Sequence, residues 1–238
     1  DIYPLLMAGL LVPMGTLADK VGNRRILLTG LVIFGVASAA TAFAPTAQLL
    51  IGARVMLALG GSMIMPCVLG IIRRTFEDDK ERGLALGLWG TVGAAGAAVG
   101  PLIGGALLEH FWWGSVFLLG VPVMALLLLV GPFLLPECRD ENAGRLDVVS
   151  ALLCIVALLL VIYGLKDTAR DGLNLGALLA VVLGLVVGTV FTRRQRRLPD
   201  PMLDLTLFSR RAFTVSIFAM LMAIFALSGA WLMIFQCL

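Results

Sequence analysis

Charged residues that could do chemistry are scarce in this sequence, and several of them share one short segment. Residues 15–25 read GTLADKVGNRR, with one carboxylate, Asp19, and three basic side chains. So short a link between antiparallel helices needs Gly22 for its turn. Asp19 can accept backbone donors at a helix start or pair with a neighbouring cation. On residue types alone, an ordinary solvated loop explains this segment as well as a charged functional element does.

Arg54 is a second candidate, because apolar residues flank it on both sides. An arginine inside the hydrocarbon of a membrane costs about 2.5–3.5 kcal/mol on insertion scales, so its side chain should face a bundle interior or a wet cavity. The alternative is that the side chain snorkels to the lipid headgroups, because Arg54 lies only a few residues from one end of its span.

The third feature is GAAGAAVGPLIGG, residues 93–105, with five glycines and a proline in an uncharged run. At about 100° per residue the glycines project from one narrow face of a helix, which suits close contact with a neighbouring membrane helix. Pro101 removes a backbone donor and should bend or loosen the helix near Ala97. A packing stripe of small residues explains the glycines, whereas it does not require the proline.

Catalytic and metal-binding patterns do not appear in the sequence. It has no Ser-His-Asp set, no HExxH, no phosphate-binding glycine loop and no Cys/His cluster, and its four cysteines share no CxxC spacing. The one histidine, His110, sits beside Glu109 and is assigned to a headgroup contact. We therefore predict no enzyme activity, no catalytic residue, no metal and no cofactor.

The elements that must position these residues are membrane helices. The 238 residues are 60% hydrophobic and 14% charged, with a mean hydropathy of +1.03, too apolar for a water-soluble globule. Eight charge-free windows approach or exceed the ~18 to 20 residues that cross a bilayer, so we predict an all-α, polytopic membrane bundle. The windows lie between Asp1 and Asp19, Arg25 and Arg54, Arg54 and Arg73, Arg82 and Glu109, Glu109 and Arg139, Asp147 and Lys166, Asp171 and Arg193, and from Arg211 onward.

The basic residues predict the orientation. Fifteen of the 18 lysines and arginines fall in alternate loops, after the first, third, fifth and seventh spans. By the positive-inside rule those loops are cytoplasmic. The net charge of +3 then reflects topology and gives no reason to expect nucleic-acid binding. The chain opens on Asp1 without an initiator Met and is still apolar at Leu238, so we expect a fragment.

The glycine run resembles a known signature. Residues 90–105, ending VGPLIGG, are similar to the antiporter signature of the fifth transmembrane helix in the major facilitator superfamily. The resemblance implies a kinked, glycine-faced helix that packs against the opposite half of a transporter and limits leak. Its positions here are Gly90, Gly93, Gly96, Gly100, Pro101, Gly104 and Gly105.

Two further stretches resemble signatures of that family. Gly15, Asp19, Lys20, Gly22 and Arg24 match the signature between its second and third helices, which implies a cytoplasmic charge lock, or gate, between two halves. The run RVMLALGGSMIMP, residues 54–66, is similar to the fourth-helix signature. That resemblance implies a part in proton coupling for Arg54, and Asp1 is expected to assist.

The domain organisation points to one branch of the family. Residues 1–135 are expected to form helices 2–6 of the N-terminal half, and residues 136–211 a linker region with two extra membrane helices and a basic cytoplasmic loop. Residues 212–238 would begin the C-terminal half. Two added helices are typical of the fourteen-helix drug:proton antiporters, so the chain is expected to supply eight of fourteen helices.

The resemblance implies an efflux transporter of the bacterial inner membrane that exchanges protons for amphipathic, cationic drugs by alternating access. Its expected partners are the lipid bilayer, a small-molecule substrate and protons, and the protein is expected to be a monomer. Three alternatives stay open: an exporter of an endogenous lipid or metabolite, a polytopic membrane enzyme, and a non-transporting sensor.

Overall fold

The computed structural model describes residues 2–137, 147–172, 174–198, 201 and 205–237. Helices account for most of this part of the chain, and it contains no strand. In chain order the elements are α1 (Ile2–Val21), α2 (Asn23–Ala42), α3 (Ala47–Thr75), α4 (Asp79–His110), α5 (Ser115–Leu118), α6 (Gly120–Leu134), α7 (Val148–Asp171), α8 (Leu175–Gln195), the 3-10 turn η1 (Leu205–Ser209) and α9 (Arg211–Cys237). The all-α prediction is confirmed.

The predicted spans correspond closely to these helices. Seven helices of the described residues are long and apolar enough to cross a membrane, with α5 and α6 counted together, and α9 contributes a shorter apolar stretch over Arg211–Leu227. The chain is therefore a multi-pass membrane protein. The predicted window between Arg25 and Arg54 is too long for one helix. Helix α2 ends at Ala42, because Pro45 cannot continue it, and Thr46 starts α3 by accepting from the Leu49 amide at 3.3 Å.

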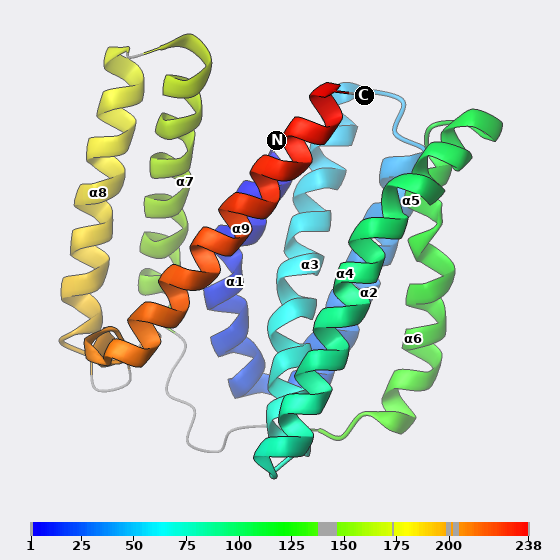
Figure 1. The fold of residues 1–238 in the computed structure, drawn as a ribbon, viewed down its shortest axis with the longest axis horizontal. Coiled ribbons are helices and arrows are strands. Elements are labelled where there is room, and N and C mark those ends of the chain that lie inside the picture. Colours follow the sequence, from blue (N-terminus) through cyan, green and yellow to red (C-terminus); the bar gives the residue numbers. More distant parts are fainter. Residues whose placement is uncertain (1, 138–146, 173, 199–200, 202–204, 238) are drawn as a thin grey trace.

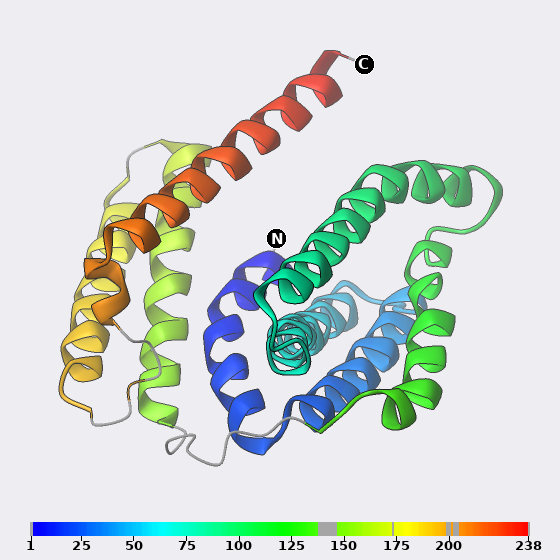
Figure 2. The same ribbon diagram turned by 60° about the horizontal axis from the view of Figure 1, so that its bottom comes forward.

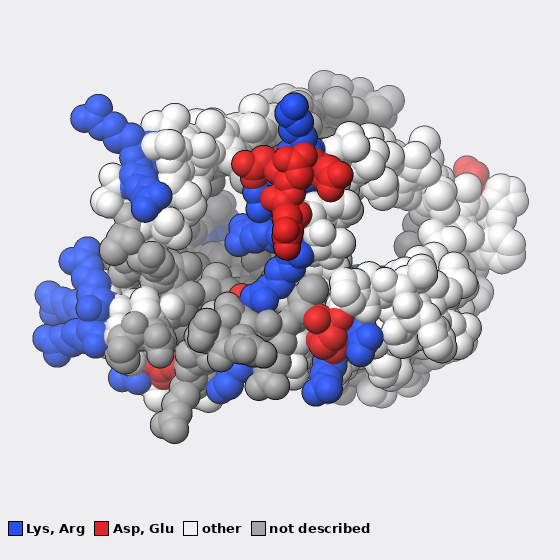
Figure 3. Space-filling model, turned by 90° about the horizontal axis from the view of Figure 1, so that it is seen from below, with Lys and Arg blue, Asp and Glu red and all other residues white. Residues whose placement is uncertain are grey.

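Successive helices run up and down, so that alternate connections lie at the same end of the molecule (Figure 1). Figure 3 shows the molecule from below, where several groups of lysine and arginine side chains lie on an otherwise largely uncharged surface, with fewer acidic side chains among them. This surface is called the basic end below. Its described cations are Lys20, Arg24, Arg25, Arg73, Arg74, Lys80, Arg82, Arg193, Arg194, Arg196, Arg197, Arg210 and Arg211.

The core lies between α1, α2 and α3, with α6 beside α2 (Figure 2). Helices α2 and α3 approach so closely at Gly60 that an added Cβ would lie 2.8 Å from the Phe34 amide nitrogen. Below this crossing Ala18, Leu31 and Cys67 belong to one buried cluster. Close helix packing through a small residue thus occurs between α2 and α3.

Helices α7 and α8 form a hairpin beside α1 (Figure 2). A Cβ added at Gly184 of α8 would lie 2.7 Å from Val161 of α7, and a Cβ at Gly9 of α1 would lie 3.6 Å from the Ile155 Cα. Asn174 begins α8 by accepting from the Ala177 amide at 2.6 Å. This hairpin is therefore packed against α1 through α7.

Candidate functional site

Gly22 makes the turn between α1 and α2, and its conformation requires glycine. Its φ is +122° with ψ 129°, a region that side chains with a Cβ rarely adopt. An added Cβ would also overlap Glu137 Oε1. The Gly22 amide donates to the Ala18 carbonyl at 2.9 Å, which closes α1 before the turn. The predicted role of Gly22 in the turn is confirmed, and the contact with Glu137 adds a reason that the sequence did not show.

Arg24 joins this turn to the end of α6. Its Nε lies 3.4 Å from Glu137 Oε2, and its Nη1 donates to the carbonyls of Pro132 at 3.3 Å and Leu135 at 3.4 Å. Arg25 Nε lies 3.6 Å from the same carboxylate oxygen. These guanidinium contacts also satisfy carbonyls at the C-terminus of α6, where cations are favourable. Glu137 is a functional candidate that the sequence analysis missed, because 113 residues separate it from Arg24.

Asp19 pairs with the end of α3. Arg74 Nη2 lies 3.7 Å from Asp19 Oδ1, and the Asp19 side chain keeps 50% of its surface exposed. Nearby, a Cβ added at Gly15 would lie 3.5 Å from Pro66 Cβ, so α1 and α3 are close beneath this pair. Lys20 is partly buried at the end of α1. The carboxylate is thus held within this chain while one side of it stays open to another partner.

Arg54 lies in the second turn of α3 and is partly buried. Its Cζ sits 5.1 Å from the centre of the Phe117 ring of α5, within the range of a cation–π contact. Phe117 belongs to an aromatic group with Trp112 and Trp113. The guanidinium therefore has a defined protein contact at the end of the molecule opposite the basic end. Asp1, its expected assistant, lies outside the described residues.

The glycine face of α4 is open. Against the described part of the chain no residue of α4 is buried, and the helix continues through Pro101. Figure 2 shows the ribbon of α4 bending toward its C-terminal end. A Cβ would meet no atom within 4 Å at Gly90, Gly93, Gly96, Gly100, Gly104 or Gly105. The expected close contact of this face is not made by the described residues.

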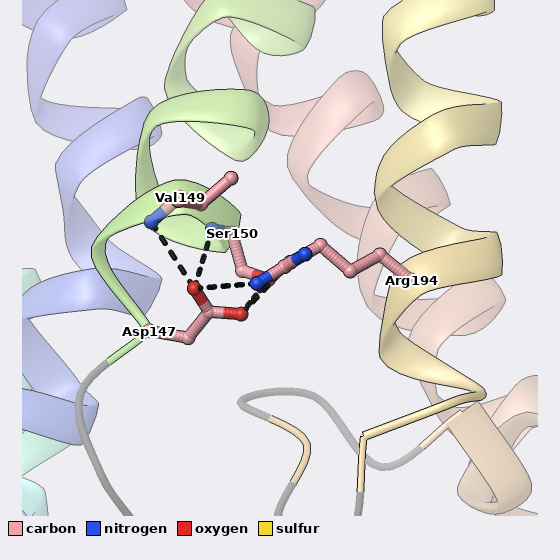
Figure 4. Close-up of polar contacts among 4 residues, drawn as sticks. All are labelled: Asp147, Val149, Ser150 and Arg194. Atoms are coloured by element: carbon pink, nitrogen blue, oxygen red, sulfur yellow. Dashed lines mark hydrogen bonds and ion pairs between the residues drawn. The ribbon is translucent and has the colours of Figure 1, made fainter.

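A third ionic contact joins the start of α7 to the end of α8, and it was not predicted from the sequence (Figure 4). Asp147 caps α7 by accepting from the amides of Val149 at 3.1 Å and Ser150 at 3.2 Å. Arg194 at the end of α8 donates to both Asp147 oxygens, at 3.0 and 3.2 Å. The hydrogen bonds from Arg194 and Ser150 hold the pKa of the Asp147 carboxyl at about 2, below its usual 3.8. An Asp before an apolar run, three residues ahead of a Ser, was the available signal for the cap.

The arrangement offers charge pairing and helix packing rather than bond-making chemistry. Among the residues that the structure describes, no three His, Cys, Asp or Glu side chains are placed to hold a metal ion. Each charge pair at the basic end joins two parts of the fold. Asp19 and Arg74 join α1 to α3, and Asp147 and Arg194 join α7 to α8. Arg24 and Glu137 join α2 to the segment that follows α6.

Comparison with known proteins identifies relatives over nearly the whole chain. The sequence model of the family described as Major Facilitator Superfamily matches residues 2–237. The multidrug efflux pump LfrA of Mycolicibacterium smegmatis is 48% identical over 229 residues, which cover 96% of this chain and 45% of that protein. The methyl viologen resistance protein SmvA of Salmonella typhimurium is 41% identical over 237 residues, 99% of this chain and 48% of that protein. The methylenomycin A resistance protein of Streptomyces coelicolor is 32% identical over 235 residues, 98% of this chain and 49% of that protein. The chain spans about half the length of these relatives.

Proposed function

Because the chain belongs to the major facilitator superfamily, we propose that it serves in a drug efflux transporter of the bacterial inner membrane that exchanges protons for amphipathic, cationic compounds. The observation that carries the proposal is the similarity, over 96% of the chain or more, to a multidrug efflux pump and to resistance proteins of bacteria. Family membership also favours a transporter over an enzyme. An exporter of an endogenous lipid or metabolite is the alternative that the test below separates.

Gly15, Asp19, Lys20, Gly22 and Arg24 are proposed to form the gate at the basic end. Gly22 and Arg24 fix the α1–α2 turn against Glu137, and this turn begins directly after the end of α1 that carries Asp19. Asp19 is half exposed and pairs with Arg74 at 3.7 Å, a long and weak contact. A cation from the opposite half of the transporter could therefore exchange with Arg74 at little cost. This exchange would close and open the basic end.

Arg54 is proposed to act on proton coupling through its charge. A guanidinium stays protonated at any physiological pH, so it cannot itself carry the transported proton. It can instead stabilise the ionised form of a nearby carboxylate, and this stabilisation is lost when the helices move the two groups apart. Asp1 is the proposed carboxylate of this chain. The cation–π contact with Phe117 gives the Arg54 guanidinium a partner on the protein, which supports this role over snorkelling to the lipid headgroups.

The open glycine face of α4 is proposed to seal the transporter against its opposite half. Lipid tails give no hydrophobic reward for helix association, so close packing of small residues supplies the attraction. The described residues leave that face, including Gly93, Gly96 and Gly100, free of contacts within 4 Å of an added Cβ. Pro101 would let the seal bend as the halves rock, as in other repeat-built transporters.

The test places the full-length protein in inverted vesicles with an acidic lumen, adds the lipophilic cation ethidium and records lumenal pH. Wild type should release lumenal protons on addition, and Asp19→Asn and Arg54→Ala should release them at least tenfold more slowly. Asp79→Asn is the matched control, because this exposed carboxylate pairs with Arg82 inside α4. If folded, correctly oriented wild type never changes lumenal pH, exchange of ethidium for protons is wrong and the endogenous substrate becomes the leading proposal.

A further inference from the structure

A groove opens between the start of α7 and the end of α8 at the basic end, with a volume of about 540 Å³. Val149 and Leu153 line it from α7, and Val190, Arg193, Arg194 and Arg197 line it from α8 and the turn that follows. This size suits a small molecule or a lipid headgroup. Neither the gate nor the glycine face of α4 uses any of these residues.

The hairpin is tightly packed elsewhere, which limits the groove to the basic end. At Gly184 an added Cβ would lie 2.7 Å from Val161, so the helices touch there. One turn nearer to the basic end, at Gly188, the nearest atom is Ala157 Cβ at 3.9 Å. The groove therefore lies where the two helices separate, at the end of their membrane-spanning length.

The charge in the groove is positive and largely uncompensated. Arg194 is already held by Asp147 (Figure 4). Arg193 and Arg197 are both exposed, and neither makes an ion pair with the described part of the chain. Two guanidinium groups thus face one groove, and each can donate several hydrogen bonds to phosphate oxygens.

The apolar wall decides what kind of anion fits. Val149, in the first turn of α7, is 52% exposed, and Val190, in the last two turns of α8, is 48% exposed. A free phosphate ion would leave these side chains uncovered, whereas a lipid covers them with its acyl chains. Basic pockets between membrane helices on the cytoplasmic side are suited to anionic headgroups for this reason.

We propose that the α7–α8 groove binds an anionic phospholipid, with the phosphate between Arg193 and Arg197 and the acyl chains against Val149 and Val190. The Asp147–Arg194 pair holds the two helix ends at the spacing that forms the groove. The arginines also contribute to membrane orientation, but orientation alone requires no saturable or headgroup-selective site. The lipid would fasten the extra hairpin to the membrane surface.

The experiment titrates the purified full-length protein in detergent with phosphatidylglycerol and measures bound lipid by native mass spectrometry. Phosphatidylcholine with the same acyl chains tests headgroup charge, and water-soluble glycerophosphoglycerol tests the phosphate without chains. The variant is Arg193→Gln with Arg197→Gln. Its matched control is Arg210→Gln with Arg211→Gln, which removes the same charge from exposed positions of the same end outside the groove.

In detergent only an arginine that contacts the bound headgroup should contribute, by about fivefold or about 1 kcal/mol each. We expect saturable phosphatidylglycerol binding that falls roughly 25-fold in the groove variant and less than threefold in the control. Phosphatidylcholine should bind at least tenfold more weakly than phosphatidylglycerol to wild type. Equal losses in both variants, equal binding of the two lipids, or full competition by the soluble headgroup would each overturn the proposal.

Discussion

Replacing Gly22 with Ala tests whether the turn between α1 and α2 holds the core of the chain together. Alanine at φ +122° and ψ 129° is strained, and strain of this kind costs about 1–3 kcal/mol. Its Cβ would also overlap Glu137 Oε1 and come within 3.0 Å of Glu137 Cδ. Glu137 must then move away from Arg24 and Arg25, partly exposed pairs worth under about 1 kcal/mol. The expected total is about 2–3 kcal/mol.

Cys67 gives a local measurement of this loss. Its side chain is fully buried, in the cluster that also contains Ala18 and Ile26, the residues on either side of the turn. A thiol reagent can reach Cys67 only when this region opens, so the labelling rate reports the opening equilibrium. A loss of 2–3 kcal/mol should raise the rate roughly 30- to 150-fold. Cys154 in α7 is the internal reference, and its labelling should change less than threefold.

Two further variants separate strain from overlap. Gly52→Ala is the matched control, because an added Cβ there meets no atom within 4 Å and the residue lies inside α3. This substitution should leave the labelling rate of Cys67 unchanged or lower it. Glu137→Ala removes the overlapping carboxylate, so Gly22→Ala should cost less in that background. If Gly22→Ala labels like Gly52→Ala, the turn does not constrain the core and the reasoning is wrong.

Asp147→Asn keeps an N-cap but removes the charge that Arg194 binds. The free energy of unfolding should fall by about 1–2 kcal/mol, a value discounted because Arg194 is 41% exposed. Labelling of Cys154 should become about 5- to 30-fold faster, whereas labelling of Cys67 should not change. The pKa of Asp147 is lowered from 3.8 to about 2, so its contribution to stability should be constant above about pH 5, decline below about pH 4 and disappear as the pH falls through 2. Wild type and Asp147→Asn should therefore converge in the free energy of unfolding, measured in detergent, only near pH 2. Phe117→Leu removes the ring under Arg54 and should lower the free energy of unfolding in mixed detergent by about 1 kcal/mol, whereas Phe117→Tyr should not; equal losses would show that the cation–π contact is not the cause.

The succession of membrane-length helices could be predicted from the sequence, because a bilayer restricts a chain to long apolar helices whose backbone groups are satisfied internally. The boundary between α2 and α3 was harder to predict from the sequence. No charge separates them, so the window between Arg25 and Arg54 concealed a turn at Pro45 and Thr46. Local breakers mark such a boundary better than charge does.

Pairing between distant segments could not be predicted. Glu137 lies more than 110 residues from Arg24, and Arg194 lies 47 residues from Asp147, so neither pair has a periodic signal in the sequence. Glycine stripes are ambiguous in the same way. Gly60 packs against Phe34, whereas Gly96 meets no atom within 4 Å of an added Cβ, although both are helical glycines in apolar runs. Composition shows that a face can pack and leaves its partner undetermined.

The contacts at the basic end bear on how the proposed rocking motion could work. Arg24 with Glu137 and Asp147 with Arg194 each combine an ion pair with backbone contacts: Arg24 binds two carbonyls at the end of α6, and Asp147 caps α7. Breaking either would therefore expose helix ends as well as separate charges. Asp19 differs, because its ion pair with Arg74 is long, at 3.7 Å, and half of its side chain is exposed. Of these three pairs, Asp19–Arg74 is therefore the one expected to break most easily in a motion that keeps the helices of this chain together. This is why Asp19→Asn should impair exchange without speeding Cys67 labelling, whereas Gly22→Ala should affect both.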